Sequence, residues 1–263
     1  MNHYLYALVD RMPAAWQRPS GGICGAAVVP QRVDDVVVLG SVIESVPAAT
    51  PRTLALHHDV VGSVMDAAAL VPFHYGATVP LAALPDWLAA RRAEVAAALA
   101  AVRDCVEMSV KLLRLDCAID QQLARSRRAE QRSDSAPDEP ALRALAGALV
   151  ERAALPQWGY RPSGSGGNVV GSVAFLVPRP DLTGFLSRIA PVASRAVGVA
   201  VVPTGPWPPY SFVPPLERAP SARWRSACRR RLPGCRPRPS AIHWQTLRRL
   251  PARLPGLYPG APA

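Results

Sequence analysis

Three histidines are the first residues whose type and spacing suggest chemistry. His57 and His58 are adjacent, and His74 follows in the next segment. Imidazole nitrogens are common metal ligands, so the three invite comparison with a zinc site. Adjacent side chains on a helix point about 100° apart, however, and no acidic or cysteine residue stands at a matching spacing. The pattern favours surface or half-buried histidines, and we predict no metal site and no cofactor.

A second candidate is the glycine- and serine-rich run at 161–168, Arg-Pro-Ser-Gly-Ser-Gly-Gly-Asn. Loops of this composition can cradle a phosphate when they open a helix and end in Lys-Ser or Lys-Thr. This run has no lysine and leads into a strand-like segment. A connecting loop or hairpin is therefore the favoured interpretation.

Glu107 and Lys111 are spaced i, i+4 in a segment with strand alternation, so both lie on its polar face. They can pair with neighbouring strands or with a partner, although a solvated face is the simpler interpretation. Cys228 and Cys235 have no second pair with which to form a zinc ribbon. The chain also lacks a nucleophile elbow, an HExxH pair and a dinucleotide fingerprint. We predict that it is not an enzyme.

The most distinctive stretch is 203–213, Pro-Thr-Gly-Pro-Trp-Pro-Pro-Tyr-Ser-Phe-Val. Proline fixes φ and removes a backbone donor, so this composition argues against a helix or a central strand. An extended, polyproline-like arm is expected, which presents Trp207, Tyr210 and Phe212 in fixed directions. These aromatic side chains either pack onto the protein's own domain or form a docking element for a partner.

Four further motifs precede this stretch in the chain. In chain order the five are Tyr4-Leu5-Tyr6-Ala7-Leu8-Val9, Val71-Pro72-Phe73-His74-Tyr75-Gly76, Val106-Glu107-Met108-Ser109-Val110-Lys111, Ser172-Val173-Ala174-Phe175-Leu176-Val177 and Gly205-Pro206-Trp207-Pro208-Pro209-Tyr210-Ser211-Phe212-Val213.

In this order and spacing the motifs resemble the gas vesicle accessory protein F/L family over residues 3–213. The resemblance implies two α+β domains and a non-enzymatic assembly factor that binds the small hydrophobic shell protein and assists nucleation. Other accessory proteins of the vesicle are implied partners, and the cytoplasm is the implied location. Partner binding or domain docking is expected at Trp207, Tyr210, Phe212, His74, Tyr75 and Gly76. His74 is a departure, because the family usually has an arginine there.

The formal charge of +11 is concentrated in one part of the chain. Residues 214–263 hold eleven arginines against a single glutamate, which accounts for +10 and leaves +1 for the rest. An alternative function follows from this segment: binding of nucleic acid or an anionic surface by counterion release. The body is neutral, and no folded reading element accompanies the arginines, so nucleic acid is the less favoured partner. Five cysteines without a framework spacing, and no apolar run of the ~18 residues that cross a membrane, suit a soluble intracellular protein.

The periodicity of the first half predicts an α+β domain at 1–115, with a mainly antiparallel sheet and helices on one face. Apolar alternation and β-branched residues indicate strands, and 3.6-residue periodicity indicates helices. The expected strands are 4–9, 25–29, 36–43, 73–79 and 106–112, and the expected helices are 53–70 and 85–103.

The second half is predicted to hold a charged helical arm at 116–137 and a second α+β domain at 138–213, with ferredoxin-like elements. A tail at 214–263, with ten prolines and no periodicity, is expected to be disordered. The elements expected in the second domain are helices at 140–154 and 181–189, a loop at 161–168, and strands at 169–177 and 197–202.

Overall fold

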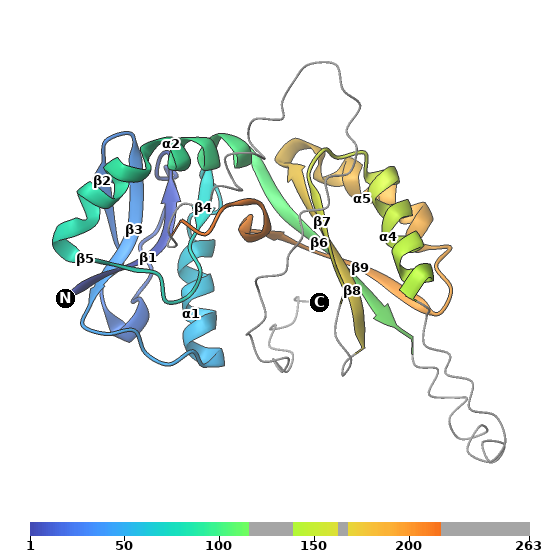
Figure 1. Ribbon diagram of the computed structural model, residues 1–263, viewed down its shortest axis with the longest axis horizontal. Helices are drawn as coiled ribbons and strands as arrows, with labels where there is room; N and C mark the ends of the chain where they lie inside the picture. The colour runs from blue at the N-terminus through green and yellow to red at the C-terminus, as the bar shows by residue number, and fades with distance from the viewer. Residues whose placement is uncertain (116–138, 163–167, 217–263) are drawn as a thin grey trace, which may run out of the picture.

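The computed structural model describes residues 1–115, 139–162 and 168–216 (Figure 1). These residues form two antiparallel sheets with helices, which confirms the predicted α+β class. The expected arm at 116–137 and the expected tail from residue 217 onward lie outside the described residues. Within the described residues, no helix combines the length and apolar character needed to cross a bilayer.

The first sheet has five strands, in the order β2-β3-β1-β4, with β5 also paired to β1. All of its pairings are antiparallel. Helix α1 (Pro51–Gly62) follows β3, and helix α2 (Leu84–Val102) follows β5. The strands are β1 (Asn2–Val9), β2 (Val29–Val33), β3 (Val36–Ile43), β4 (Leu70–Pro72) and β5 (Thr78–Pro80).

Strand β1 is the centre of this sheet and is buried on both faces. Its continuous apolar run is typical of a strand covered on two sides. Leu5 belongs to a core cluster shared with α2, whereas Tyr4 and Tyr6 belong to a cluster shared with α1. Because neighbouring side chains on a strand point to opposite faces, the first sheet has one helix on each face. The expectation that both helices of this unit lie on one face was therefore wrong.

The second sheet has four strands, in the order β7-β8-β6-β9, again all antiparallel. Its strands are β6 (Cys105–Arg114), β7 (Trp158–Pro162), β8 (Val169–Pro178) and β9 (Val199–Trp207). Helices α4 (Glu139–Ala153) and α5 (Leu182–Ala193) share one core cluster with this sheet, on one face of it (Figure 1). The β-α-β-β-α-β sequence and strand order are ferredoxin-like.

Strand β6 corrects the sheet assignment made from sequence. The expected first unit ended at residue 115 and included this strand, yet β6 pairs with β8 and β9 and completes the second sheet. It follows α2 after a two-residue turn in which Asp104 has a left-handed φ of 55°. The alternation of 106–112 was correct. Alternation alone, however, does not say which neighbours a strand will find.

Three further expectations in the first half were wrong. In place of one strand at 73–79 there are two short strands, β4 and β5, that both pair with β1 and are separated by a loop. The strand expected at 25–29 begins only at Val29, because Cys24 and Gly25 have positive φ and close a 3-10 turn. The helix expected at 53–70 ends at Gly62. The turns that follow still bury Val64 and Ala67 in the cluster shared with α1, so the apolar periodicity continued past the end of the helix.

The proline-rich stretch is also more regular than expected. Strand β9 extends to Trp207 and includes Pro206. Proline is tolerated there because β9 is an edge strand, whose outward N–H positions need no partner. Gly205 has a φ of +131°, and a Cβ at this position would lie 2.9 Å from the carbonyl oxygen of Glu107. The close approach of β9 to β6 therefore requires glycine.

Candidate functional site

Residues 208–216, which we call the strap, are the segment of the fold that is most informative about function. The strap continues from β9 and runs back from the second sheet toward the first (Figure 1). It contains a short 3-10 turn at Tyr210–Phe212. Its contacts with each unit show why the 203–213 stretch has its unusual composition.

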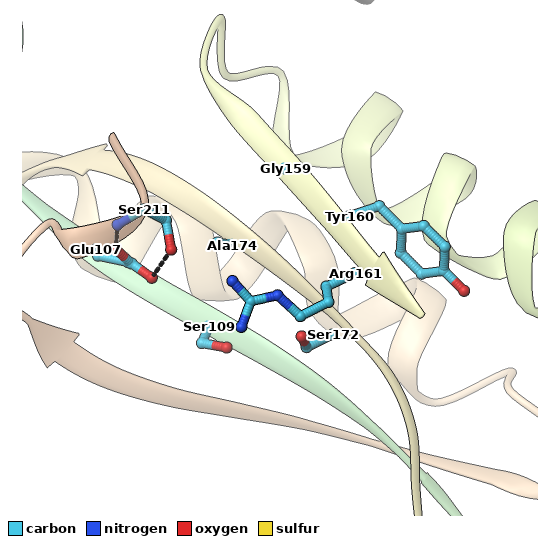
Figure 2. Close-up of a pocket in the computed structure, with 8 residues that line it drawn as sticks. All are labelled: Glu107, Ser109, Gly159, Tyr160, Arg161, Ser172, Ala174 and Ser211. Atoms are coloured by element: carbon cyan, nitrogen blue, oxygen red, sulfur yellow. Dashed lines mark hydrogen bonds between the residues drawn. The ribbon is translucent and has the colours of Figure 1, made fainter. Parts of the chain in front are cut away.

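The strap is held to the second sheet by Glu107 of β6. The backbone N–H of Ser211 donates to Oε2 of Glu107 at 2.8 Å, and the Ser211 hydroxyl donates to Oε1 at 2.7 Å (Figure 2). Burial raises the pKa of Glu107, while the two bonds from Ser211 and the positive charge of Arg161 oppose that rise. Glu107 is only 8% exposed, so the expected solvated face is in fact covered here by the strap.

Tyr210 is the contact of the strap with the first unit. Its ring centroid lies 5.5 Å from that of His58 and 5.6 Å from that of His74. Its hydroxyl is 3.4 Å from Nδ1 of His58. Burial of the phenol raises the pKa of Tyr210, so it remains a neutral hydroxyl. The strap thus joins strand β6 to the α1 and 73–76 region through two adjacent residues.

The end of the strap enters the apolar core beside α2. Val213 and Leu216 are buried in the cluster shared with this helix, and Phe212 packs against it. The Arg91 side chain of α2 donates from Nε to the carbonyl oxygen of Leu216 at 3.2 Å. The expected tail was taken to start at residue 214, but Leu216 is only 2% exposed, so residues 214–216 pack with the folded part of the chain.

A buried hydrogen-bonded chain lies beneath Tyr210. His57 Nε2 is 2.9 Å from the carbonyl oxygen of Phe73, which can only accept, so His57 donates from this nitrogen. Its Nδ1 then accepts from the Tyr4 hydroxyl at 2.9 Å. Burial lowers the pKa of His57 to about 4, so the ring is neutral at pH 7. With both nitrogens engaged, His57 has no position for a metal.

Gly76 completes this chain from the loop between β4 and β5. Its N–H donates to the Tyr4 hydroxyl at 3.2 Å. The φ of Gly76 is +91°, a conformation that an L side chain rarely adopts. Beside it, the Tyr75 hydroxyl donates to the carbonyl oxygen of Pro47 at 3.0 Å. The loop is thus fixed by the Tyr4 side chain of β1 and by a backbone carbonyl of the segment before α1.

The structure brings together some of the residues that the sequence singled out. Tyr210 contacts His74 directly, and Tyr75 and Gly76 lie next to His74 in the same loop. Trp207 and Phe212 lie elsewhere: Trp207 Nε1 reaches Thr204 Oγ1 at 3.4 Å, and Phe212 packs on the α2 side. Among the described residues, no three His, Cys, Asp or Glu side chains gather as metal ligands would.

Sequence reasoning missed two contacts of the strap, Glu107 with Ser211 and Arg91 with Leu216. Each joins residues more than a hundred positions apart. An acidic residue on the polar face of a strand looks solvated unless the covering segment is known. The only available signal was the unusual stiffness of the 203–213 stretch.

Three comparisons with known proteins show which family and which solved structures the chain is similar to. The family model described as gas vesicle synthesis protein GvpL/GvpF matches residues 2–155 and 114–214. The search of curated proteins finds no match. Among solved structures, the gas vesicle protein GvpF from Anabaena sp. PCC7120 is similar, with a TM-score of 0.63 at 17% identity, covering 80% of this chain and 95% of that one.

GvpF from Microcystis aeruginosa is similar in the same way. Its TM-score is 0.62 at 16% identity, and the match covers 80% of this chain and 98% of that chain. At such identities the structures support the fold, while the family model supplies the assignment. Because that model matches most of the sequence, from β1 through the strap, the chain belongs to the GvpL/GvpF family of gas vesicle synthesis proteins.

Proposed function

We propose that this protein is a non-enzymatic assembly factor of gas vesicles that binds the small hydrophobic shell protein and assists nucleation of the shell. The observation that carries the proposal is the family match over residues 2–155 and 114–214. A role in gas vesicle assembly follows from that membership. The shell protein as direct partner, an association with the vesicle and a cytoplasmic location are parts of the proposal.

The proposal has a physical basis in the chemistry of the partner. A small subunit with an exposed apolar, β-rich surface aggregates unless that surface is covered until it joins the shell. A factor that binds it must offer apolar and aromatic surface without being aggregation-prone itself. Half-buried aromatic side chains held by hydrogen bonds meet both requirements, because their rings contact the partner and their polar atoms are satisfied.

We place the contact on the aromatic seam, which we define as His58, His74, Tyr75 and Tyr210. The rings of His58 and His74 both contact that of Tyr210, and His74, Tyr75 and Tyr210 are all half-buried. Trp207 and Phe212 lie apart from the seam, at Thr204 and on the α2 side, and we propose them as separate points of partner contact or domain docking. The seam lies where the strap meets the first unit, so it presents a fixed surface built from both halves of the chain.

The experiment is capture of purified shell protein by the full-length chain carrying His74→Ala. This change removes a half-buried ring that contacts the ring of Tyr210, and should weaken capture at least about threefold, as loss of one interface aromatic does. Leu186→Ala is the matched control, because Leu186 is 39% exposed on α5, on the other side of the second sheet. Equal capture by both variants, at unchanged melting temperature, would remove the seam from the proposal.

A further inference from the structure

The face of the second sheet opposite α4 and α5 carries small and polar side chains in register. Lys111 pairs with Ser172, and Ser172 pairs with Arg161, so these three lie in one row across β6, β8 and β7. The next row, Ser109, Ala174 and Gly159, has no large side chain. The sheet therefore has a basic row beside a shallow floor of small residues.

A pocket of about 80 Å³ lies over this floor. Its walls include Glu107, Ser109, Arg161, Ser172 and Ser211 (Figure 2). The Arg161 side chain extends from β7 into the pocket, over Ser109 and Ser172, while Glu107 and Ser211 close the opposite end. Such a volume suits the end of one side chain and is well below the ~300 Å³ of ordinary small-molecule sites.

The charges of the pocket select the kind of side chain that fits. Both carboxylate oxygens of Glu107 already accept hydrogen bonds from Ser211, so its negative charge is partly compensated by the strap. Arg161 interacts electrostatically with Glu107, and its guanidinium carries a positive charge and five N–H donors in a fork that matches the geometry of a carboxylate. Lys111 stands two strands away from Arg161, about 10 Å at the usual strand spacing. The row is therefore positive at both ends with a serine hydroxyl between.

We propose that this pocket binds a carboxylate side chain of a protein partner, presented on an extended segment with Asp or Glu at alternate positions. The guanidinium of Arg161 pairs with the first carboxylate in a forked geometry, and the hydroxyls of Ser109 and Ser172 are within the same pocket to donate to it. Lys111 receives the second carboxylate. The inference stands independently of the seam and of the shell protein as partner.

Two other occupants fit less well. A polyphosphate or nucleic acid backbone would bring several negative charges against Glu107, which lines the pocket. The arginine-rich segment 214–263 has the wrong sign, with eleven arginines and one glutamate. Charge complementarity thus favours an acidic protein segment.

The test is an NMR titration of the ¹⁵N-labelled full-length chain with the peptide acetyl-Gly-Glu-Gly-Glu-Gly-amide. We expect saturable shifts of the Ser109, Ser172 and Ser211 amides, with a Kd on the order of 1 mM, as befits one or two charge-assisted contacts. The same peptide with glutamine in place of glutamate should produce no saturable shift. Equal binding of the glutamine peptide would overturn the proposal.

Three variants of the full-length chain make the test specific. Arg161→Gln should weaken binding at least about tenfold, because it removes a charge-assisted pair. Arg195→Gln changes charge equally at an exposed position after α5 and should leave the Kd within about twofold. Ala174→Leu fills the floor without changing charge and should abolish binding. Equal weakening by the two arginine variants, or tighter binding of inorganic phosphate at the same amides, would contradict a carboxylate site.

Discussion

The hydrogen bonds between Ser211 and Glu107 give the sharpest prediction about the strap. Ser211→Ala removes the 2.7 Å bond from the hydroxyl to Oε1 and leaves the backbone bond to Oε2. A hydrogen bond to a charged group contributes about 1.5–3 kcal/mol, and Glu107 is buried, so we expect the free energy of unfolding to fall by about 2 kcal/mol. For a chain of this size that corresponds to roughly 4–8 °C in melting temperature.

The same loss should depend on pH in a defined direction. Burial raises the pKa of Glu107. The buried carboxyl is therefore most compatible with the folded state when it is protonated. This stabilisation is fully present below the unfolded pKa of about 4.3 and is lost as the pH rises through the folded pKa. The Ser211 bond lowers that folded pKa, so it favours the ionised form. The cost of Ser211→Ala should then be about 2 kcal/mol at pH ~8 and below about 1 kcal/mol at pH ~4.

Urea unfolding of the full-length chain at the two pH values measures both quantities. Ser187→Ala is the control, because the Ser187 hydroxyl is exposed on α5 and donates only to the Thr183 carbonyl. It should change the free energy of unfolding by no more than about 0.5 kcal/mol. A Ser211→Ala chain that behaves like this control, or whose cost is greater at acidic pH, would refute a stabilising bond from the Ser211 hydroxyl to ionised Glu107.

Three other predictions follow from buried or strained positions. Burial lowers the pKa of His57 to about 4. As the pH is lowered from ~6.5 to ~4, the free energy of unfolding should therefore decrease by about 3 kcal/mol. ¹⁵N NMR of the ring should show no titration near pH ~6.5. Leu216→Ala should cost about 2–4 kcal/mol in urea unfolding, against less than about 1 kcal/mol for the exposed Leu186→Ala; similar costs would contradict burial of the strap. Gly76→Ala should lower the free energy of unfolding by about 1–2 kcal/mol, because Gly76 has a φ of +91°. Gly62→Ala should not, because Gly62 has open space around it. An unchanged free energy of unfolding for Gly76→Ala would show that the loop is not constrained in this way.

Much of the fold was predictable because its strands and helices have clean local patterns. Strand β3 has the expected bounds, and α2 and α4 fall within one residue of theirs. Local patterns cannot decide which strands pair. The alternation of 106–112 is equally compatible with either sheet, so β6 was assigned to the wrong one.

The candidate site was predictable only in part, for a related physical reason. The aromatics of 203–213 stand out by composition, and Tyr210 does meet His74. The partner of Ser211 is a glutamate 104 positions earlier, and burial of that glutamate follows from where the strap lies. Likewise, His57 looked like one of a pair of surface histidines. Its burial depends on Tyr4 and the Phe73 carbonyl meeting it across the sheet.

The most direct test of shell-protein binding by the folded part of the chain is capture of purified shell protein by the full-length chain and by a chain ending after residue 216. Each is measured at low and high salt. The truncation belongs after residue 216, because Leu216 is buried and accepts the bond from Arg91. The proposed contact on the folded body predicts equal capture by both chains, insensitive to salt. Capture by the full-length chain alone, lost at high salt, would contradict it and assign the interaction to the arginines beyond residue 216.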